Sequence, residues 1–273
     1  MSLLKLVFDF YIKASIHVAF SVYAFLRITE IYFNLPNNKP LNYFIFFGTI
    51  TGYNFVKYAG VAKLHHRSLT NDLKAIQIFS FLCFLALCYF AFQIKLNTLF
   101  FTIPFTLLTV LYAVPFLGGF EKNLRQISYL KILVVAFVWA GFTVLIPLLD
   151  SGKEISFKIT MLTLQRFLVV IILILPFDIR DVKYDVISLQ TIPRKIGIKK
   201  TKKLGLILLV FALLLEYLIS SSSLLKTPFM LFFFLTIILL MRTKSEQSKY
   251  YCSFWVEALP IIWWLLLLGF HNF

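Results

Sequence analysis

The sequence predicts an all-α integral membrane protein that forms a single domain over residues 1–273, and composition, hydropathy and charge placement together predict it. Of the 273 residues, 60% are apolar and only 14% are charged, and the mean hydropathy is +0.87. A soluble domain needs more charge than this to cover its core. We therefore expect lipid to solvate most of the surface.

Nine apolar segments have the length, or nearly the length, of a membrane-spanning helix. About 20 mostly apolar residues cross a bilayer, and shorter segments are tolerated where the bilayer thins. The eighth segment is the shortest, and losing it would change the parity of the count. We expect spans near residues 14–33, 41–62, 74–92, 97–116, 129–149, 158–177, 203–221, 227–241 and 251–270.

The basic residues are concentrated in alternate connections between these spans. Nineteen of the 27 lysines and arginines lie in the N-terminal segment and near 63–74, 120–131, 178–203 and 242–249, whereas five lie in the connections of the other side. The positive-inside rule then places the N-terminus in the cytoplasm. The residues before the first span predict an interfacial segment and no removable signal peptide. We expect no nucleic-acid partner, because no soluble domain is present to carry a basic face.

Three aspartates stand at the end of the sixth expected span. Asp178, Asp181 and Asp185 are spaced i, i+3 and i+7, which puts their carboxylates on one face of a helix. Clustered carboxylates repel one another unless a cation lies among them, and Mg²⁺ prefers carboxylate oxygens. The alternative is a solvated loop in which Arg180 and Lys183 pair with the acids.

This stretch resembles the second aspartate-rich motif of the UbiA-type membrane prenyltransferases and the threonine-leucine-proline segment that follows it. The residues that carry the resemblance are Asp178-Ile-Arg180-Asp181 and Asp185, followed by Thr191-Ile-Pro193 and Gly197. The nine-span layout with a cytoplasmic N-terminus is also that of the family. The resemblance implies a helical bundle around a central cavity, with two aspartate-rich motifs at its cytoplasmic mouth.

The resemblance also implies a reaction. Family members bind an isoprenyl diphosphate through Mg²⁺, ionise it to an allylic cation and join it to an acceptor, often an aromatic ring or another lipid. For this chain it implies that Asp178, Asp181 and Asp185 bind the metal and carry catalysis. The expected partners are a prenyl diphosphate, a hydrophobic acceptor and membrane lipid.

A further patch is similar to the tyrosine-bearing fourth span of the family and its basic loop. It contains Tyr112 and Pro115, followed by Lys122 and Arg125. The resemblance implies that Lys122 and Arg125 neutralise phosphate and that Tyr112 belongs to the same diphosphate site, lining the cavity. The alternative is that Tyr112 is one of the tyrosines of the interfacial belts.

The first aspartate-rich motif of the family is degenerate here. Its asparagine corresponds to Asn54, which we expect to remain in the diphosphate site as a polar ligand or orienting group. Its two aspartates correspond to Tyr58 and Ala62. Neither replacement binds Mg²⁺ as a carboxylate does, so we expect one metal site to be retained. Lys57 is either a substitute for the missing cation, bound to diphosphate or to the aspartates, or an interfacial lysine that extends toward the lipid headgroups.

The other charged residues within the expected spans point to no specific chemistry. Arg27 and Glu30 are spaced i, i+3 and predict a structural ion pair. Glu216 and Glu257 are single acids without a partner that the sequence identifies.

The function predicted first is a UbiA-like prenyltransferase. One alternative is a non-catalytic protein of the same fold that binds an isoprenoid or quinone-like lipid, or a partner enzyme. Another is a cyclase that quenches the prenyl cation internally. A transporter is disfavoured, because the acids gather at one mouth and not along a path at bilayer depth. We expect a bacterial inner membrane, with the site facing the cytoplasm.

Overall fold

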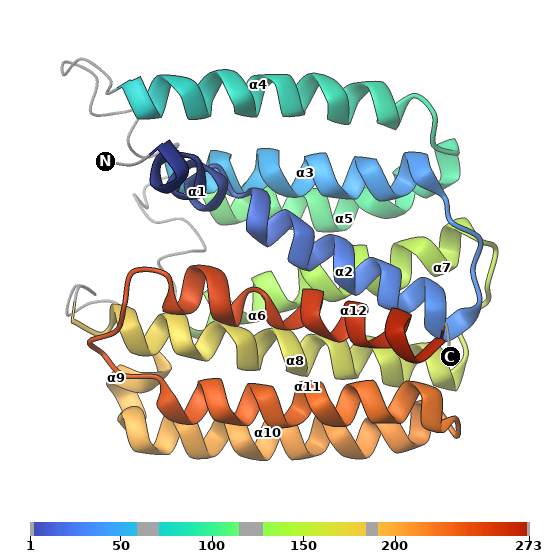
Figure 1. Cartoon of the computed structure of the whole chain (residues 1–273). Helices are drawn as coiled ribbons and strands as arrows, with labels where there is room; N and C mark the ends of the chain where they lie inside the picture. The colour runs from blue at the N-terminus through green and yellow to red at the C-terminus, as the bar shows by residue number, and fades with distance from the viewer. Residues whose placement is uncertain (1–2, 59–70, 115–127, 184–190, 272–273) are drawn as a thin grey trace.

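The computed structural model describes residues 3–58, 71–114, 128–183 and 191–271, and within these ranges the chain is helical without a strand. The long helices run side by side, with α4 on one side of the bundle and α10 and α11 on the other (Figure 1). The first helix and the end of the last lie at opposite ends of the bundle (Figure 1). The helices are α1 (Leu3–Lys13), α2 (Ile16–Phe33), α3 (Lys39–Tyr58), α4 (Asn71–Ala91), α5 (Leu96–Ala113), α6 (Ser128–Ala140), α7 (Ile146–Asp150), α8 (Phe157–Asp181), α9 (Ile192–Ile196), α10 (Ile198–Ile219), α11 (Ser223–Arg242) and α12 (Leu259–His271).

Seven of the described segments are long and apolar enough to cross a membrane, which confirms the predicted all-α membrane fold. They are Ile16–Phe33, Asp72–Ala91, Leu96–Ala113, Leu130–Asp150, Phe157–Asp181, Ser223–Arg242 and Tyr251–Phe270. The two remaining predicted spans correspond to α3 and α10, which are equally long and pack along α4 and α8 respectively. Helix α3 is less apolar than the seven, and the first turns of α10 carry four lysines. The count of nine and the orientation of the termini stay predictions.

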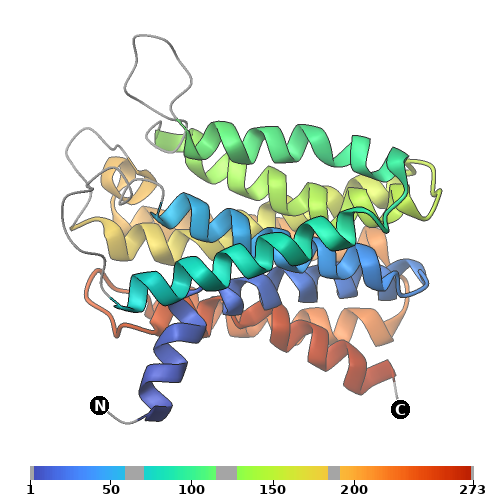
Figure 2. The ribbon, with the colours of Figure 1, turned by 90° about the horizontal axis from the view of Figure 1, so that it is seen from above.

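Helix α1 forms an elbow with α2 and runs across the direction of the long helices (Figure 2). Ser15 makes the turn in the left-handed region, with φ of 63°. Asp9 is buried and accepts hydrogen bonds from Lys249 Nζ at 2.6 Å and from Tyr250 Oη at 2.5 Å. These two bonds lower the pKa of Asp9 below its ordinary value. The N-terminal helix is therefore fastened to the segment that precedes the last span.

The main core lies where α2, α8, α11 and α12 meet. Trp263 is fully buried there, and its ring lies 4.9 Å from that of Phe232 and 5.0 Å from that of Phe229. The guanidinium of Arg166, also fully buried, lies 4.1 Å from the ring centre of Phe25 and donates to the carbonyl of Phe25 at 2.9 Å. Between helices in a membrane, such packing contacts supply much of the stability.

A π-helical segment, Gly141–Leu145, separates α6 from α7, and Phe105 of α5 packs against its first residue. A Cβ at Gly141 would overlap the ring of Phe105. That ring is held by Phe137 and Phe142, whose ring centres lie 5.4 Å and 5.8 Å away, so it has little room to move.

We therefore expect Gly141→Ala to lower the free energy of unfolding by about 1–3 kcal/mol, the usual cost of overpacking. Thermal unfolding in detergent would measure it. Gly269→Ala is the matched control, because nothing lies within 4 Å of a Cβ there. An equal effect at both glycines would contradict the close contact of α5 with the π-helical segment.

Candidate active site

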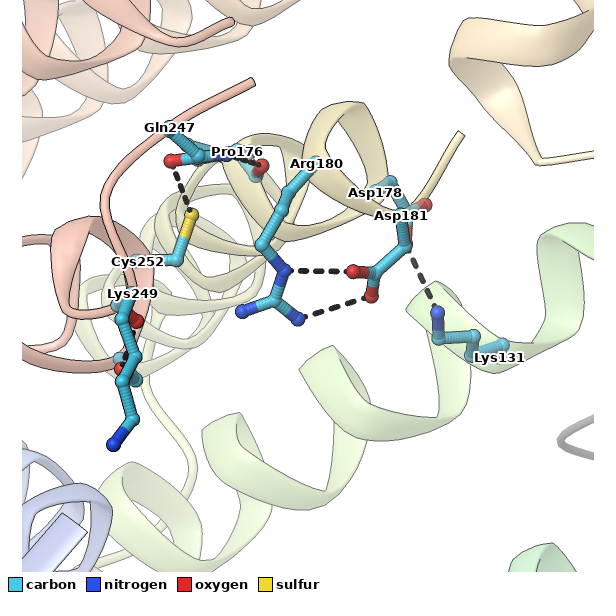
Figure 3. Close-up of polar contacts among 9 residues, drawn as sticks. Lys131, Pro176, Asp178, Arg180, Asp181, Gln247, Lys249 and Cys252 are labelled. Carbon is cyan, nitrogen blue, oxygen red and sulfur yellow. Dashed lines mark hydrogen bonds and ion pairs between the residues drawn. The ribbon is translucent and has the colours of Figure 1, made fainter. Parts of the chain in front are cut away.

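The last turn of α8 carries two of the three predicted metal ligands. Asp178 is 1% exposed, and its Oδ1 accepts from Lys131 Nζ of α6 at 3.0 Å (Figure 3). Asp181, one turn later, is about one-third exposed, and its carboxylate faces Arg180 (Figure 3). The helix ends at Asp181. The two carboxylates thus reach the same end of α8 but bind different cations.

Arg180 binds Asp181 with two hydrogen bonds. Its Nε donates to Oδ1 at 2.7 Å and its Nη2 donates to Oδ2 at 3.1 Å, while the third nitrogen points away from Asp181 (Figure 3). The alternative interpretation of this stretch, a solvated loop, predicts this pairing of Arg180 with an aspartate. Lys183 instead pairs with Glu246. Fork-shaped pairing fixes the plane of the guanidinium, so its remaining donor has a defined direction.

Three predicted site residues, Asp185, Lys122 and Arg125, lie outside the described residues. Within the described ranges no three side chains of His, Cys, Asp or Glu are grouped closely enough to hold a metal ion. Asp178 and Asp181 have the oxygen donors that Mg²⁺ prefers, and they stand one turn apart. They fit one Mg²⁺ site, provided that Asp181 exchanges Arg180 for the metal.

Asn54 lies at the place of the family's first motif but is engaged within the protein. It is buried; its Nδ2 donates to the carbonyl of Ala14 at 3.0 Å and to Ser80 Oγ at 2.8 Å, and its Oδ1 accepts from Ser15 Oγ at 2.7 Å. Tyr58, at the place of the first aspartate, donates to the carbonyl of Lys13 at 3.1 Å. Both residues hold the α1–α2 elbow against α3.

Lys57 lies beside this elbow. Its Nζ donates to Ser15 Oγ at 2.8 Å, and it interacts electrostatically with Glu257 at the start of the last span. Glu257 also interacts with Arg180. The acid that interacts electrostatically with Lys57 is therefore Glu257, which the sequence did not suggest as its partner.

Three aromatic side chains, Tyr53, Tyr112 and Trp139, are linked to one another and to charged groups of the site. Trp139 Nε1 donates to Tyr53 Oη at 3.0 Å, and Tyr112 is buried and interacts electrostatically with both Tyr53 and Lys131. Tyr53 interacts in turn with Glu257. The aromatic residues thus interact with Lys131 through Tyr112 and with Glu257 through Tyr53.

The sequence did not predict the roles of two charged residues of the site, Lys131 and Glu257. Lys131 was one of several basic residues near the fourth span, and nothing in its spacing marks it as the partner of Asp178. Glu257 was noted as an in-span acid, which is itself the available signal, because such residues are costly and usually functional.

Comparison with known proteins identifies the fold. No family model and no curated protein sequence matches the chain. A UbiA homologue from Archaeoglobus fulgidus, solved with GPP and Mg²⁺ and also with DMAPP and Mg²⁺, aligns over 96% of this chain with 12% identity and a TM-score of 0.62, and the alignments cover 100% and 99% of the homologue chains. A structure described for digeranylgeranylglyceryl phosphate synthase in membranes aligns over 96% of this chain and 94% of its own, with 17% identity and a TM-score of 0.57. The chain has the UbiA-type prenyltransferase fold.

Proposed function

We propose that the chain is a UbiA-like prenyltransferase that moves an isoprenyl group from its diphosphate to a hydrophobic acceptor. The observation that carries the proposal is the end of α8, where Asp178 and Asp181 stand beside Lys131 and Arg180 in a fold whose solved examples bind prenyl diphosphates with Mg²⁺. Carboxylates that can bind a metal and basic side chains that can bind phosphate oxygens occur together there, as the cleavage of a diphosphate requires.

The diphosphate end of the substrate would lie against α8. Asp178, Asp181 and Asp185 would hold one Mg²⁺, which when bound neutralises charge on the departing diphosphate. Arg180, freed from Asp181, and Lys131 would then turn their donors to phosphate oxygens, together with Lys57 and the predicted Lys122 and Arg125. Asn54 acts as an orienting group, because it fixes Ser15, which in turn holds Lys57.

The rest of the reaction needs a dry, electron-rich surface. When the bond between the allylic carbon and the diphosphate oxygen breaks, pyrophosphate leaves with the electron pair and a carbocation remains. The faces of Tyr53, Tyr112 and Trp139 would shelter this cation until the acceptor supplies electrons and loses a proton. On the charge distribution we also propose that this end of the bundle faces the cytoplasm. A bacterial inner membrane stays a prediction.

A second candidate is a non-catalytic protein of this fold that binds an isoprenoid lipid. It is favoured by the pairing of Asp178 with Lys131 and of Asp181 with Arg180, which neutralises both acids without a metal.

Binding of a non-hydrolysable prenyl diphosphate to the detergent-purified protein would separate the two. We expect binding that requires Mg²⁺, is lost in EDTA, and weakens by more than about tenfold in Asp181→Asn/Asp185→Asn, since ligand carboxylates matter at least as much as the groups around them. Asp72→Asn, an exposed acid paired with Lys13, is the control and should change nothing. Absence of binding under every condition would contradict a prenyltransferase. Metal-independent binding that survives the double substitution would support the non-catalytic protein.

A further inference from the structure

We propose that the end of the bundle opposite Asp178 and Asp181 binds the phosphate headgroup of a membrane lipid, in a cavity between α2, α8 and the α10–α11 connection. This inference goes beyond the proposed function and does not depend on it, because none of the residues proposed for the diphosphate takes part.

The cavity has a volume of about 310 Å³, which is in the range of small-molecule sites. The α10–α11 connection forms part of its wall and lies at the end of the bundle opposite α9 (Figure 1). Its polar lining residues are Tyr32, Asn34, Lys158 and Ser220–Ser222. Among the described lining residues the charged one is a lysine, so the cavity favours an anionic ligand.

Lys158 supplies this positive charge from the first turn of α8, whose last turn carries Asp178 and Asp181. Its Nζ reaches the carbonyl of Tyr32 only at 3.5 Å and lies 5.0 Å from the ring centre of Phe33. In the described part of the chain it forms no ion pair with a carboxylate. An ammonium carries several donors, so one long contact leaves others for an anion in the cavity.

The α10–α11 connection adds uncharged donors. The amide of Ser222 donates to Ser220 Oγ at 3.1 Å, which tightens the turn. Ser222 precedes α11, but its hydroxyl does not cap the helix, and the exposed hydroxyl of Ser221 forms no hydrogen bond with the described residues. Hydroxyl groups, together with an ammonium group, are donors that suit the oxygens of a phosphate group.

The acid nearest to this lining is already engaged. Glu216 is fully buried and does not line the cavity. Its carboxylate accepts from the hydroxyl of Tyr32 at 2.8 Å and from Gln165 Nε2 at 2.9 Å. Because Tyr32 lines the cavity and also binds this carboxylate, an anion in the cavity meets the tyrosine and not the acid.

Apolar side chains at the rim indicate that the anion belongs to a lipid. Leu224 lines the cavity and is 47% exposed. Leu218 and Phe157, each next in sequence to a lining residue, are 60% and 68% exposed. A free phosphate would use only the donors, whereas a phospholipid can place its headgroup among them and its acyl chains over the apolar surface. Basic pockets between membrane helices bind lipid headgroups in this way.

The experiment is a titration of the detergent-purified protein in EDTA, followed by native mass spectrometry. EDTA removes Mg²⁺-dependent binding at the aspartates. The ligands are dihexanoyl phosphatidic acid, dihexanoyl glycerol, which lacks the phosphate, and inorganic phosphate, which lacks the chains. We expect phosphatidic acid to bind at least about tenfold more tightly than either of the others. Lys158→Met should weaken it by about tenfold, the usual effect of losing a charged hydrogen bond.

Two further variants make the test specific. Lys153→Met removes an exposed lysine from the connection that precedes α8, outside the cavity lining, and should leave the affinity unchanged. Ser221→Leu removes a donor and fills part of the cavity, so it should also weaken phosphatidic acid. Because Ser221 is exposed, this variant keeps the test available should Lys158→Met fail to fold.

Three results would overturn the inference. Inorganic phosphate that binds as tightly as phosphatidic acid would show a site for a free anion and not for a lipid. Equal binding of dihexanoyl glycerol would show that the phosphate is not recognised. Binding of phosphatidic acid that is absent, or that Lys153→Met weakens as much as Lys158→Met, would show that the cavity is not the site.

Discussion

Replacing Trp263 with alanine is expected to lower the free energy of unfolding by about 3–5 kcal/mol, the range for removing a buried tryptophan. The side chain has no exposed surface and joins α12 to three other helices. Besides its contacts with Phe232 and Phe229, its ring lies 5.4 Å from the guanidinium carbon of Arg166. Between helices in a membrane this loss is one of packing, because lipid cannot fill the space as the ring does.

Unfolding of the purified protein in mixed micelles would measure the effect. Trp255→Ala is the matched control, because Trp255 lies on the same C-terminal span with 55% of its surface exposed. We expect a change within about 0.5 kcal/mol there, as for exposed positions in general. Equal losses at the two tryptophans would show that the core around Trp263 is not closely packed.

A second large loss is expected for Glu216→Leu. Glu216 is fully buried on α10, and its carboxylate accepts from Tyr32 Oη at 2.8 Å and from Gln165 Nε2 at 2.9 Å. It also interacts electrostatically with Arg166. Removing the acid leaves Arg166 without this compensating charge in the bundle interior, which we expect to cost about 3–5 kcal/mol.

The double variant Arg166→Met/Glu216→Leu tests the reason for this loss. Removing both charges should cost clearly less than the sum of the two single changes, because neither leaves a charge behind. Glu154→Leu, at an exposed acid, is the control for the substitution itself. Strictly additive losses would mean that Arg166 and Glu216 contribute independently.

The positions of the spans could be predicted because each apolar run must be long enough to cross the lipid. The sixth was expected at 158–177 and α8 occupies Phe157–Asp181, longer because the acidic turn continues the helix. The eighth was expected at 227–241 and α11 occupies Ser223–Arg242. Hydropathy missed its first turn because Lys226 lies near the helix end, where charge can reach the interface.

The partners of the in-span charges were predictable only within one helix. Arg27 and Glu30 form the expected ion pair, because their i, i+3 spacing alone brings them together. Glu216 meets Tyr32 of α2 and Gln165 of α8, and Asp178 meets Lys131 of α6. Such pairs depend on which faces of neighbouring helices pack together, and the hydropathy of the sequence does not determine this packing.

The degenerate first motif illustrates the same limit at the site. Its sequence indicated which ligands were lost but not what the replacements do. In the structure Asn54 and Tyr58 hold the α1–α2 elbow, and Lys57 interacts electrostatically with Glu257, which is 200 residues later in the chain. Only the fold brings that acid to Lys57.

The elbow also constrains how the chain is made in the cell. Asp9 is satisfied by Lys249 and Tyr250, and the ring of His17, near the start of α2, hydrogen-bonds the carbonyl of Phe254 at 2.9 Å. A ribosome synthesises those partners more than 230 residues after the groups that need them. The contacts of the α1–α2 elbow with α3 can therefore form early in translation, whereas its contacts with the C-terminal segment form only after nearly the whole chain has been made.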